Sequence, residues 1–271
     1  MKPEVINAAL AGLLHDVGKV EQRAHSDPWR PAEGFDKEGQ PVHATWTLSF
    51  IQSYVPKQFR GAALAGAYHH APEKSPAENH SLSVLVSLAD KLSAGERADQ
   101  EKEGEKLPKQ QITIFDRIEG KVDGWHYLPL QPLELKEESL FPKSEVDERT
   151  GIDQYSVLRD MLRKAAGQKI TDGESYLENL LGAMQRTTWC VPSAYYHSTP
   201  DVSLYDHSRM TAALAVCMAE WSPEEVRNLL EAVKENYGKD EQSDKDPRLE
   251  KEVALLVGGD ISGVQDFIYT I

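Results

Sequence analysis

The sequence predicts a mainly α-helical first part, followed by a region that mixes helices with short strands. Apolar residues at helical spacing recur through residues 1–97, whereas β-branched and aromatic residues interrupted by Pro and Gly gather in residues 111–141. The run Val253–Val257 has the pattern of a buried strand. No apolar run is long enough to cross a bilayer, so we expect no membrane contact. Cys190 and Cys217 are too few for a disulfide framework or a cysteine-based zinc site, which indicates a soluble protein of a reducing compartment, the cytoplasm.

The first part is expected to contain four helices joined by loops. Pro3 suits the first turn of a helix, because that turn tolerates a missing N–H, and Gly18 is expected to end the first helix. Pro56 and Pro72 mark breaks between later helices. The expected helices are Val5–Val17, His43–Tyr54, Arg60–His70 and Ser81–Ser93.

The second part begins with a charged stretch, Glu96–Gln110, that reads as a solvated linker. Short strands are expected at Gln111–Ile118 and Trp125–Leu135. The chain ends with Val253–Val257, a tight turn and the start of a helix. A single strand with one helix cannot satisfy its own hydrogen bonds, so we expect a fragment that stops inside a domain. The helices expected before this ending are Ser156–Lys164, Ser175–Arg186 and Asp206–Trp221.

The net charge argues against a broad basic face that binds nucleic acid. The chain has 30 basic and 44 acidic side chains, for a formal net charge of −14. The charge is unevenly placed, because residues 1–97 hold 11 acidic and 10 basic side chains, whereas residues 98–271 hold 33 and 20. Six of the nine histidines also lie in residues 1–97. The acidity therefore says little about the part of the chain where the histidines gather.

The strongest chemical signal is a set of histidines and aspartates in residues 1–97. Imidazole and carboxylate are ligands that suit divalent metals, and neutral His with ionised Asp is their metal-binding form at pH 7. A carboxylate next to a histidine near a helix end is able to bridge two ions, and ions about 3.5–4 Å apart activate water and clamp a phosphoester. The candidate metal ligands are His15, Asp16, His43, His69, His70 and Asp90.

Asp90 adds a physical argument, because its helix is apolar almost all round and is therefore expected to be buried. A lone buried carboxylate costs of order several kcal/mol unless it is paired or bound to a cation, and a metal would relieve that cost. Lys19 either faces a substrate phosphate or is a solvated lysine after a helix end, and both readings stay open. Three histidines without comparable partners are left out of the site: His126, His197 and His207.

Three sequence blocks in this order resemble the large subunit of type III-A (Csm) CRISPR interference complexes. The motif His15-Asp16 alone occurs in many HD phosphohydrolases, whereas the three blocks together span nearly the whole chain. The blocks are Leu13–Lys19 with His69, His70 and Leu88–Arg97; Val191–Ala194 with Pro200–Ser208; and Gly259–Tyr269.

This resemblance implies a mainly α HD-type phosphohydrolase domain that cleaves single-stranded DNA with one or two divalent ions (Mn, Ni, Co or Mg). An α+β segment that begins a truncated ferredoxin-like palm domain would follow. The implied HD core is circularly permuted, so the helix that supplies the first histidine in other HD proteins comes later, a role we assign to His43, His69 or His70. The implied division is an HD nuclease domain at residues 1–97, a charged linker with short strands at 98–150, a helical connecting region at 151–250 and the start of the first palm at 251–271.

The resemblance also implies partners and a second activity for the complete protein. The partners are single-stranded DNA, the other type III-A subunits, CRISPR RNA and target RNA. The family's palm domains bind ATP and make cyclic oligoadenylates through a Gly-Gly-Asp-Asp motif in the second palm. Here Gly258-Gly259-Asp260 is followed by Ile261 and no second palm follows, so we expect no synthetase activity from this chain alone. In the complete protein, an ATP pocket or a turn packed on its own strand would be formed by Ser262, Gly263 and Gln265.

The sequence therefore predicts a metal-dependent nuclease of single-stranded DNA, with His15 and Asp16 in catalytic roles and Lys19 as an electrostatic helper. Two alternatives stay open, namely an HD phosphohydrolase that acts on small nucleotides and a catalytically silent scaffold. The nearly neutral charge of residues 1–97 is compatible with the nuclease, because bound cations would supply the positive charge that meets phosphate.

Overall fold

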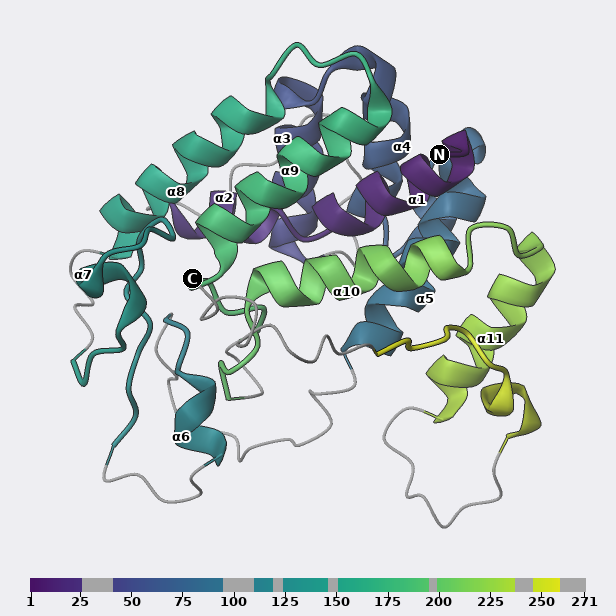
Figure 1. Cartoon of the computed structure of the whole chain (residues 1–271). Helices are drawn as coiled ribbons and strands as arrows, with labels where there is room; N and C mark the ends of the chain where they lie inside the picture. Colours follow the sequence, from purple (N-terminus) through teal and green to yellow (C-terminus); the bar gives the residue numbers. More distant parts are fainter. Residues whose placement is uncertain are drawn as a thin grey trace, which may run out of the picture.

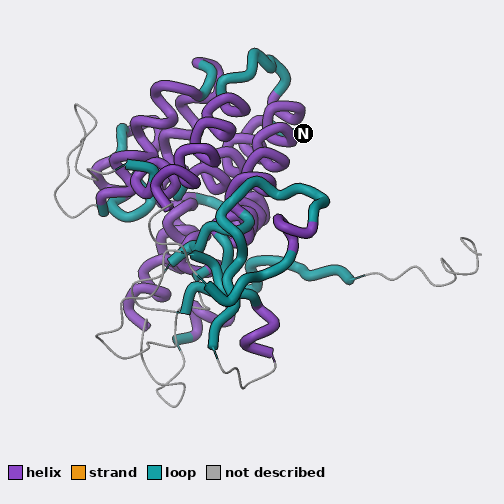
Figure 2. Tube along the Cα trace, turned by 90° about the vertical axis from the view of Figure 1, so that its left-hand side faces the viewer, coloured by secondary structure: helices purple, strands orange, loops and turns teal. Residues whose placement is uncertain are grey.

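A computed structural model describes residues 1–25, 41–94, 110–118, 124–145, 151–194, 199–236 and 246–258. Most of these residues lie in helices, which gather into one body with a loop-rich part at one end (Figure 1, Figure 2). The described ranges contain isolated β-bridges but no strand. None of the helices in these ranges is long and apolar enough to span a membrane.

Residues 1–25 and 41–94 form the four expected helices, with differences at the first and the third. The helix expected at Arg60–His70 runs from Lys57 to Ala67, so His69 and His70 follow its end. The first helix ends at Leu14, and Gly18 begins the next helix instead of ending the first one. The break arises because the Val17 N–H bonds to the carbonyl of Leu14 at 3.2 Å, one residue closer than the α-helical partner. The elements here are α1 (Pro3–Leu14), α2 (Gly18–Arg23), α3 (Val42–Tyr54), α4 (Lys57–Ala67), η1 (Pro72–Lys74), η2 (Ala77–Asn79) and α5 (His80–Ser93).

The later part contains more helix than expected. The strand expected at Gln111–Ile118 is wrong, because Ile114–Ile118 is helical, and the stretch Trp125–Leu135 contributes one residue, Tyr127, to isolated bridges. Side chains of Asp172 and Ser203 cap two of the long helices by accepting backbone N–H groups. The elements here are α6 (Ile114–Ile118), α7 (Glu137–Leu140), α8 (Gly151–Ala166), α9 (Gly173–Thr188), α10 (Leu204–Cys217), α11 (Pro223–Asn236) and η4 (Pro247–Glu250).

Helix α11 was not among the expected helices, because its surroundings are dominated by charge. Its apolar residues nevertheless follow helical spacing, with Val226, Leu229, Leu230 and Val233 on one face. This face packs on α5 in a cluster that contains Leu88. The helix therefore covers the face of α5 that carries Leu85 and Leu88.

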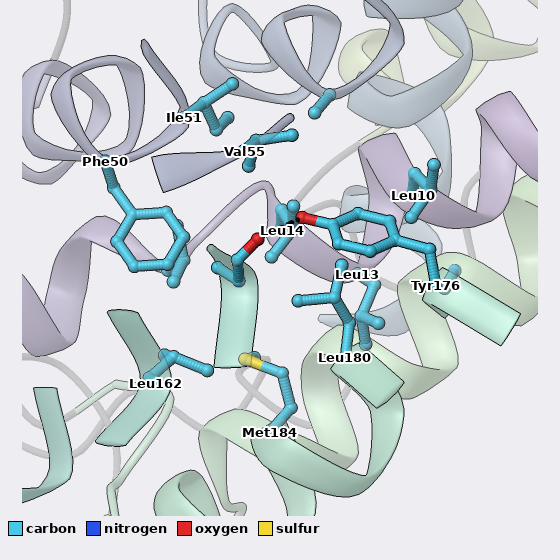
Figure 3. Packing of buried hydrophobic residues seen from close by; sticks show 14 residues of the cluster. Leu10, Leu13, Leu14, Phe50, Ile51, Val55, Leu162, Tyr176, Leu180 and Met184 are labelled. Atoms are coloured by element: carbon cyan, nitrogen blue, oxygen red, sulfur yellow. Dashed lines mark hydrogen bonds between the residues drawn. The ribbon is translucent and has the colours of Figure 1, made fainter. Parts of the chain in front are cut away.

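The main core surrounds α1, whose C-terminal half is buried on all sides (Figure 3). Leu10, Leu13 and Leu14 pack with side chains from α3, α4, α8, α9 and α10. The side chain of Tyr176 crosses this core. Its hydroxyl donates to the carbonyl of Ala166 at 2.8 Å, which satisfies the one polar atom of the side chain. Helices from both sides of the expected boundary at residue 97 thus share a single core.

Helix α10 approaches α1 very closely, and a glycine makes this possible. A Cβ added to Gly12 would lie 2.7 Å from the Cα of Ala212, a distance that real Cβ atoms do not reach. Only glycine therefore permits this backbone contact. The contact places the N-terminal half of α10, which carries His207, beside the C-terminal end of α1 (Figure 1).

The expectation that Val253–Val257 is a buried strand is wrong. Leu255 is 86% exposed and Leu256 is 97% exposed, and no strand pairs with this segment among the described residues. Val253 alone packs on the cluster formed by α5, α10 and α11. The expected palm turn and helix after Gly258 lie outside the described residues, as do Ser262, Gly263 and Gln265.

Candidate metal centre

The centre is built around the tight turn between α1 and α2, which carries His15 and Asp16. Thr47 on α3 fixes this turn, because its hydroxyl accepts the N–H of Gly18 at 3.0 Å and donates to the carbonyl of His15 at 3.1 Å. A Cβ on Gly18 would lie only 2.0 Å from the carbonyl oxygen of His43, so glycine is required where α3 crosses the turn. The hydrogen bonds of Thr47 and the close approach at Gly18 therefore hold the His15-Asp16 pair against the first turn of α3.

Two buried histidines, His15 and His69, each bond to a backbone carbonyl through Nδ1, which leaves Nε2 to face the centre. The Nδ1 of His15 bonds to the carbonyl of Gly12 at 2.7 Å, and the Nδ1 of His69 bonds in the same way to Gly66 at 2.7 Å. A carbonyl only accepts, so Nδ1 carries the hydrogen in both rings. In a neutral ring Nε2 then presents a lone pair, which is the arrangement that metal-binding histidines use.

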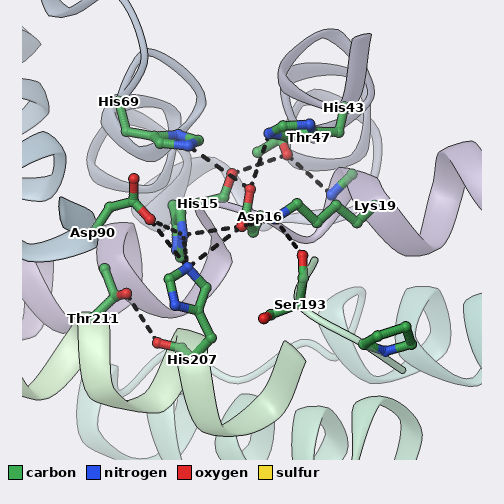
Figure 4. Close-up of polar contacts among 12 residues, drawn as sticks. His15, Asp16, Lys19, His43, Thr47, His69, Asp90, Ser193, His207 and Thr211 are labelled. Carbon is green, nitrogen blue, oxygen red and sulfur yellow. Dashed lines mark hydrogen bonds and ion pairs between the residues drawn. The ribbon is translucent and has the colours of Figure 1, made fainter. Parts of the chain in front are cut away.

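The first group of ligand atoms combines Asp16 with histidines from α3 and from the end of α4 (Figure 4). The Oδ1 of Asp16 lies 3.1 Å from the Nε2 of His43 and 3.8 Å from the Nε2 of His69. The Nε2 of His70 lies 3.0 Å from that of His43. His70 is exposed and His43 is partly so, which leaves this group at the edge of the protein interior.

The second group uses the other oxygen of Asp16 (Figure 4). The side chains of His15 and His207 are fully buried, and that of Asp90 is 13% exposed. The Oδ2 of Asp16 lies 3.3 Å from the Nε2 of His15 and 3.6 Å from the Nε2 of His207. The Oδ1 of Asp90 lies 3.0 Å from the Nε2 of His207 and 3.5 Å from that of His15. Asp16 therefore stands between two groups and offers one oxygen to each.

The donor atoms in these groups fit divalent metal ions. Ligand atoms about 2.0–2.2 Å from one ion lie about 3–3.5 Å from each other, which matches most of the separations given above. Among the described residues, the buried Oδ1 of Asp16 and the buried Nε2 of His69 have no hydrogen-bond partner. Unpaired buried polar atoms are costly, and a cation between them removes the cost. Carboxylate and imidazole are also the ligand types that such ions prefer.

The carboxylates of the centre are held in the ionised form. Burial acts to raise the pKa of Asp16, but the charges of Lys19 and His15 outweigh it and hold that pKa well below its usual value. Burial likewise opposes ionisation of Asp90, whereas hydrogen bonds from His15 and His207 keep its pKa well below the usual value. Both groups are therefore anionic at neutral pH, as metal ligands must be.

The histidines divide into two electrostatic classes. Burial lowers the pKa of His43 to about 4 and that of His69 to about 3. Partial desolvation of its ring and the neighbouring His69 also lower the pKa of His70. Burial acts to lower the pKa of His15, but the neighbouring carboxylates of Asp16 and Asp90 outweigh burial and raise this pKa to about 9. Three histidines are thus neutral at pH 7, whereas His15 holds a proton that a metal ion has to displace.

Lys19 is buried, so its reading as a solvated lysine is wrong. Its Nζ donates to the Oδ2 of Asp16 at 2.5 Å and to the carbonyl of Ser193 at 2.8 Å. The next turn of α2 repeats this contact, because Arg23 donates to the carbonyl of Pro192 at 2.7 Å. Lys19 therefore links the turn of α1 and α2 to a segment that lies far away in sequence.

His207 is a candidate ligand that was not expected from the sequence. The circular permutation implied a histidine from a later helix, and that role was assigned to His43, His69 or His70; the structure places His207 of the later helix α10 beside His15. The available signal was its position one turn into an apolar helix directly after the Ser203 cap. His126 lies elsewhere, paired with Asp116, and His197 falls outside the described residues.

Comparisons with known proteins agree with the helical fold and with the resemblance seen in the sequence. The family model of the HD domain matches residues 2–95. Over 97% of its length, the chain is 28% identical to the CRISPR system single-strand-specific deoxyribonuclease Cas10/Csm1 (subtype III-A) of Methanocaldococcus jannaschii, and it covers 34% of that protein. It is 27% identical to the protein of the same name from Enterococcus italicus, over 96% of the chain and 34% of that protein.

A solved structure shares the fold. The crystal structure of a Csm1-Csm4 cassette in complex with cA4 matches 79% of this chain and 28% of that chain, with a TM-score of 0.53 and 22% identity. The chain spans about a third of the length of the curated relatives it matches. The resemblance to the large subunit of type III-A CRISPR complexes is therefore confirmed over nearly the whole chain.

Proposed function

We propose that this chain is the nuclease part of a type III-A CRISPR large subunit and that it hydrolyses single-stranded DNA with divalent metal ions. The observation that carries the proposal is the position of Asp16, whose two oxygens face two separate groups of histidine nitrogens. A carboxylate shared in this way is suited to two neighbouring ions. The printed name of the relatives, single-strand-specific deoxyribonuclease, supports the choice of substrate.

In this proposal Asp16 belongs to both ligand groups. When bound, divalent ions supply an activated water and positive charge for the phosphate oxygens. Lys19 keeps the carboxylate of Asp16 ionised and in place, so its contribution passes through Asp16 and not through the phosphate. The remaining ligands are His15, Asp90 and His207 on the inner side, and His43, His69 and His70 on the outer side.

The outer group is the side from which a substrate would approach. His70 is exposed and the side chain of His43 is 14% exposed, whereas the side chains of His15 and His207 are fully buried. A DNA backbone is a flexible polyanion that reaches such an edge when it is single-stranded. The nearly neutral charge of residues 1–97 does not repel it once cations are bound.

For the complete protein we propose the partners and the second activity that the resemblance implies. These are the other type III-A subunits with CRISPR RNA and target RNA, and ATP at palm domains that make cyclic oligoadenylates, in the cytoplasm. The neighbour that shares the fold is itself a Csm1-Csm4 assembly. Within this chain, the proposed ATP contacts are Ser262, Gly263 and Gln265.

The nuclease proposal is tested by incubating the purified chain with end-labelled single-stranded DNA and Mn²⁺ or Ni²⁺. We expect metal-dependent cleavage that is lost in the His15→Ala/Asp16→Ala double variant. Equal cleavage by both proteins would contradict the assignment. Hydrolysis of nucleotides without cleavage of DNA would favour a small-nucleotide phosphohydrolase. A chain that binds no metal and leaves every phosphoester intact would favour the scaffold.

A further inference from the structure

A depression on the protein surface is lined by cationic side chains and, among the described residues, by no acidic one. Its volume is about 400 Å³, and it lies where α3 ends, α4 begins and the connection between α8 and α9 passes (Figure 1). This connection is tied to α4, because the side-chain amide of Gln58 donates to the carbonyl of Ile170 at 3.2 Å. The cationic residues in the lining are Lys57, Arg60 and Lys169.

These charges are not neutralised within the described part of the chain. The ammonium groups of Lys57 and Lys169 form no ion pair or hydrogen bond with a described residue. Arg60 uses two nitrogens of its guanidinium to bond the carbonyl of Val55, at 3.2 and 3.0 Å. A carbonyl carries no net charge, so the positive charge of Arg60 also remains available to an anion in the depression.

Acidic side chains near the depression in sequence are absent or are used elsewhere. Residues 41–70, which contain α3 and α4, hold no Asp or Glu, although the chain has 44 acidic residues. Behind the connection, Asp172 accepts the N–H of Ser175 at the start of α9, and Glu174 pairs with the N-terminal amine. A phosphate group that follows α3 and α4 therefore meets cations without passing an acidic residue of these helices.

Helices α3 and α4 join the depression to the metal centre. His43 lies in the first turn of α3, and Tyr54 at the end of α3 lines the depression, so the rise of 1.5 Å per residue separates them by about 16 Å. Helix α4 runs back from Lys57 to the segment that carries His69 and His70. A stacked strand rises about 3.4 Å per nucleotide, so about five nucleotides reach from the centre to the depression.

We propose that the depression binds a backbone phosphate of single-stranded DNA, about five nucleotides away from the phosphate at the metal centre, with Lys57 and Lys169 supplying the charge. The proposal rests on the nuclease function proposed above and extends its substrate site along α3 and α4. Lysine contacts phosphate as a mobile point charge and reads no base, so the site should accept strands of any sequence.

The test measures binding and cleavage of end-labelled single-stranded DNA by the full 271-residue chain. Lys57→Gln/Lys169→Gln removes both unpaired charges, and Lys57→Arg/Lys169→Arg keeps them. The matched control is Arg227→Gln/Lys234→Gln, which removes two cations from the exposed surface of α11. Arg60 is left in place, because its guanidinium bonds the backbone between α3 and α4.

Two strand lengths locate the effect. A strand of about three nucleotides is too short to span the centre and the depression, whereas one of about twelve spans both. Fluorescence anisotropy without metal gives the affinity and its salt dependence, and cleavage with Mn²⁺ gives kcat and KM. Thermal unfolding shows whether each variant is folded.

We expect Lys57→Gln/Lys169→Gln to bind the longer strand about 3- to 30-fold more weakly. The slope of log affinity against log salt should fall by about 0.7 for each lost phosphate contact. The KM for the longer strand should rise by a similar factor, with kcat and the KM for the shorter strand unchanged. The Lys57→Arg/Lys169→Arg variant and the control on α11 should match the wild type.

Wild-type affinity and salt slope in Lys57→Gln/Lys169→Gln would overturn the proposal, as would an equal loss in the control or with the shorter strand. A wild-type chain that binds the longer strand through these lysines without cutting it would defeat the nuclease and leave the phosphate site standing. A wild-type chain that cuts both strands, with KM values that no variant changes, would do the reverse. A chain that neither binds nor cuts DNA would overturn both.

Discussion

The Nε2 atoms of His15 and His207 lie 3.2 Å apart, although 192 residues separate the two histidines in the sequence. Both atoms also face carboxylate oxygens, because each lies within 3.6 Å of Asp16 and of Asp90. Imidazole nitrogens and carboxylates that converge in this way are a donor set that suits a divalent cation. The inner ligand group is therefore completed by a helix far from the HD motif.

Substitution of His207 tests whether this histidine completes the inner ligand group. We expect His207→Ala to lower the Mn²⁺ affinity by more than about 100-fold, because a direct ligand contributes more than the hydrogen-bond partner of a ligand does. The measurement is calorimetric titration with Mn²⁺. His126→Ala is the matched control, since His126 is paired with Asp116 outside the centre and should leave the affinity unchanged. Equal affinities of the two variants would remove His207 from the ligand set.

Metal binding should depend on pH through His15. In the metal-free chain, burial acts to lower the pKa of His15, but the carboxylates of Asp16 and Asp90 outweigh burial and raise this pKa to about 9. The proton on His15 therefore stabilises the metal-free fold fully below the unfolded value of about 6.5, and this contribution is lost as the pH rises through about 9. A metal ion displaces the same proton, so its affinity should rise about tenfold per pH unit between those values.

The proton release is measurable by calorimetry in two buffers that differ in their heat of protonation. We expect about one proton to be released from His15 for each chain that binds metal at pH 7.5. The neutral His43, His69 and His70 release none, because their pKa values are already low. An affinity that stays constant from pH 7 to pH 9 would show that His15 is not protonated in the metal-free chain.

Lys19 should matter for stability before any metal is bound. Its ammonium group pairs with the buried carboxylate of Asp16, and loss of one partner of a buried pair costs about 3–5 kcal/mol. We therefore expect Lys19→Met to lower the free energy of unfolding in urea by that amount in the metal-free chain. Lys2→Met removes a pair with Glu220 that is largely exposed and should leave the stability unchanged. Equal effects of the two substitutions would contradict the role given to Lys19.

The close contact between α3 and the His15-Asp16 turn predicts a strong effect at Gly18. In Gly18→Ala the new Cβ would lie 2.0 Å from a backbone oxygen and 2.3 Å from a backbone nitrogen, so α3 has to move. Both stability and Mn²⁺ affinity should fall. In Gly182→Ala the Cβ meets nothing within 4 Å on an exposed helix face, and the substitution should raise stability by about 0.5–1 kcal/mol. Thermal unfolding of both variants distinguishes a packing effect from a general cost of replacing glycine.

Local sequence patterns predicted most of the helices around the centre, because each buries a broad apolar face. The helices that carry His43 and Asp90 lie within one residue of the expected bounds. Patterns along the chain placed His207 on a helix but could not show its partners, because these lie on α1 and α5 and come near it through the packing of α10 on α1 at Gly12. The strand expected at Val253–Val257 failed for the related reason that β-branched residues need a neighbouring strand to pair with.

Asp16→Asn tests whether one carboxylate serves both ligand groups of a metal-dependent nuclease. This substitution keeps the size of the side chain and removes the charge that both groups share. Cleavage of end-labelled single-stranded DNA is measured with Mn²⁺ for the wild type and the variant, with circular dichroism to show that both are folded. We expect metal-dependent cleavage by the wild type and at least about a 100-fold loss in the variant. Cleavage by a folded Asp16→Asn variant at the wild-type rate would contradict this expectation.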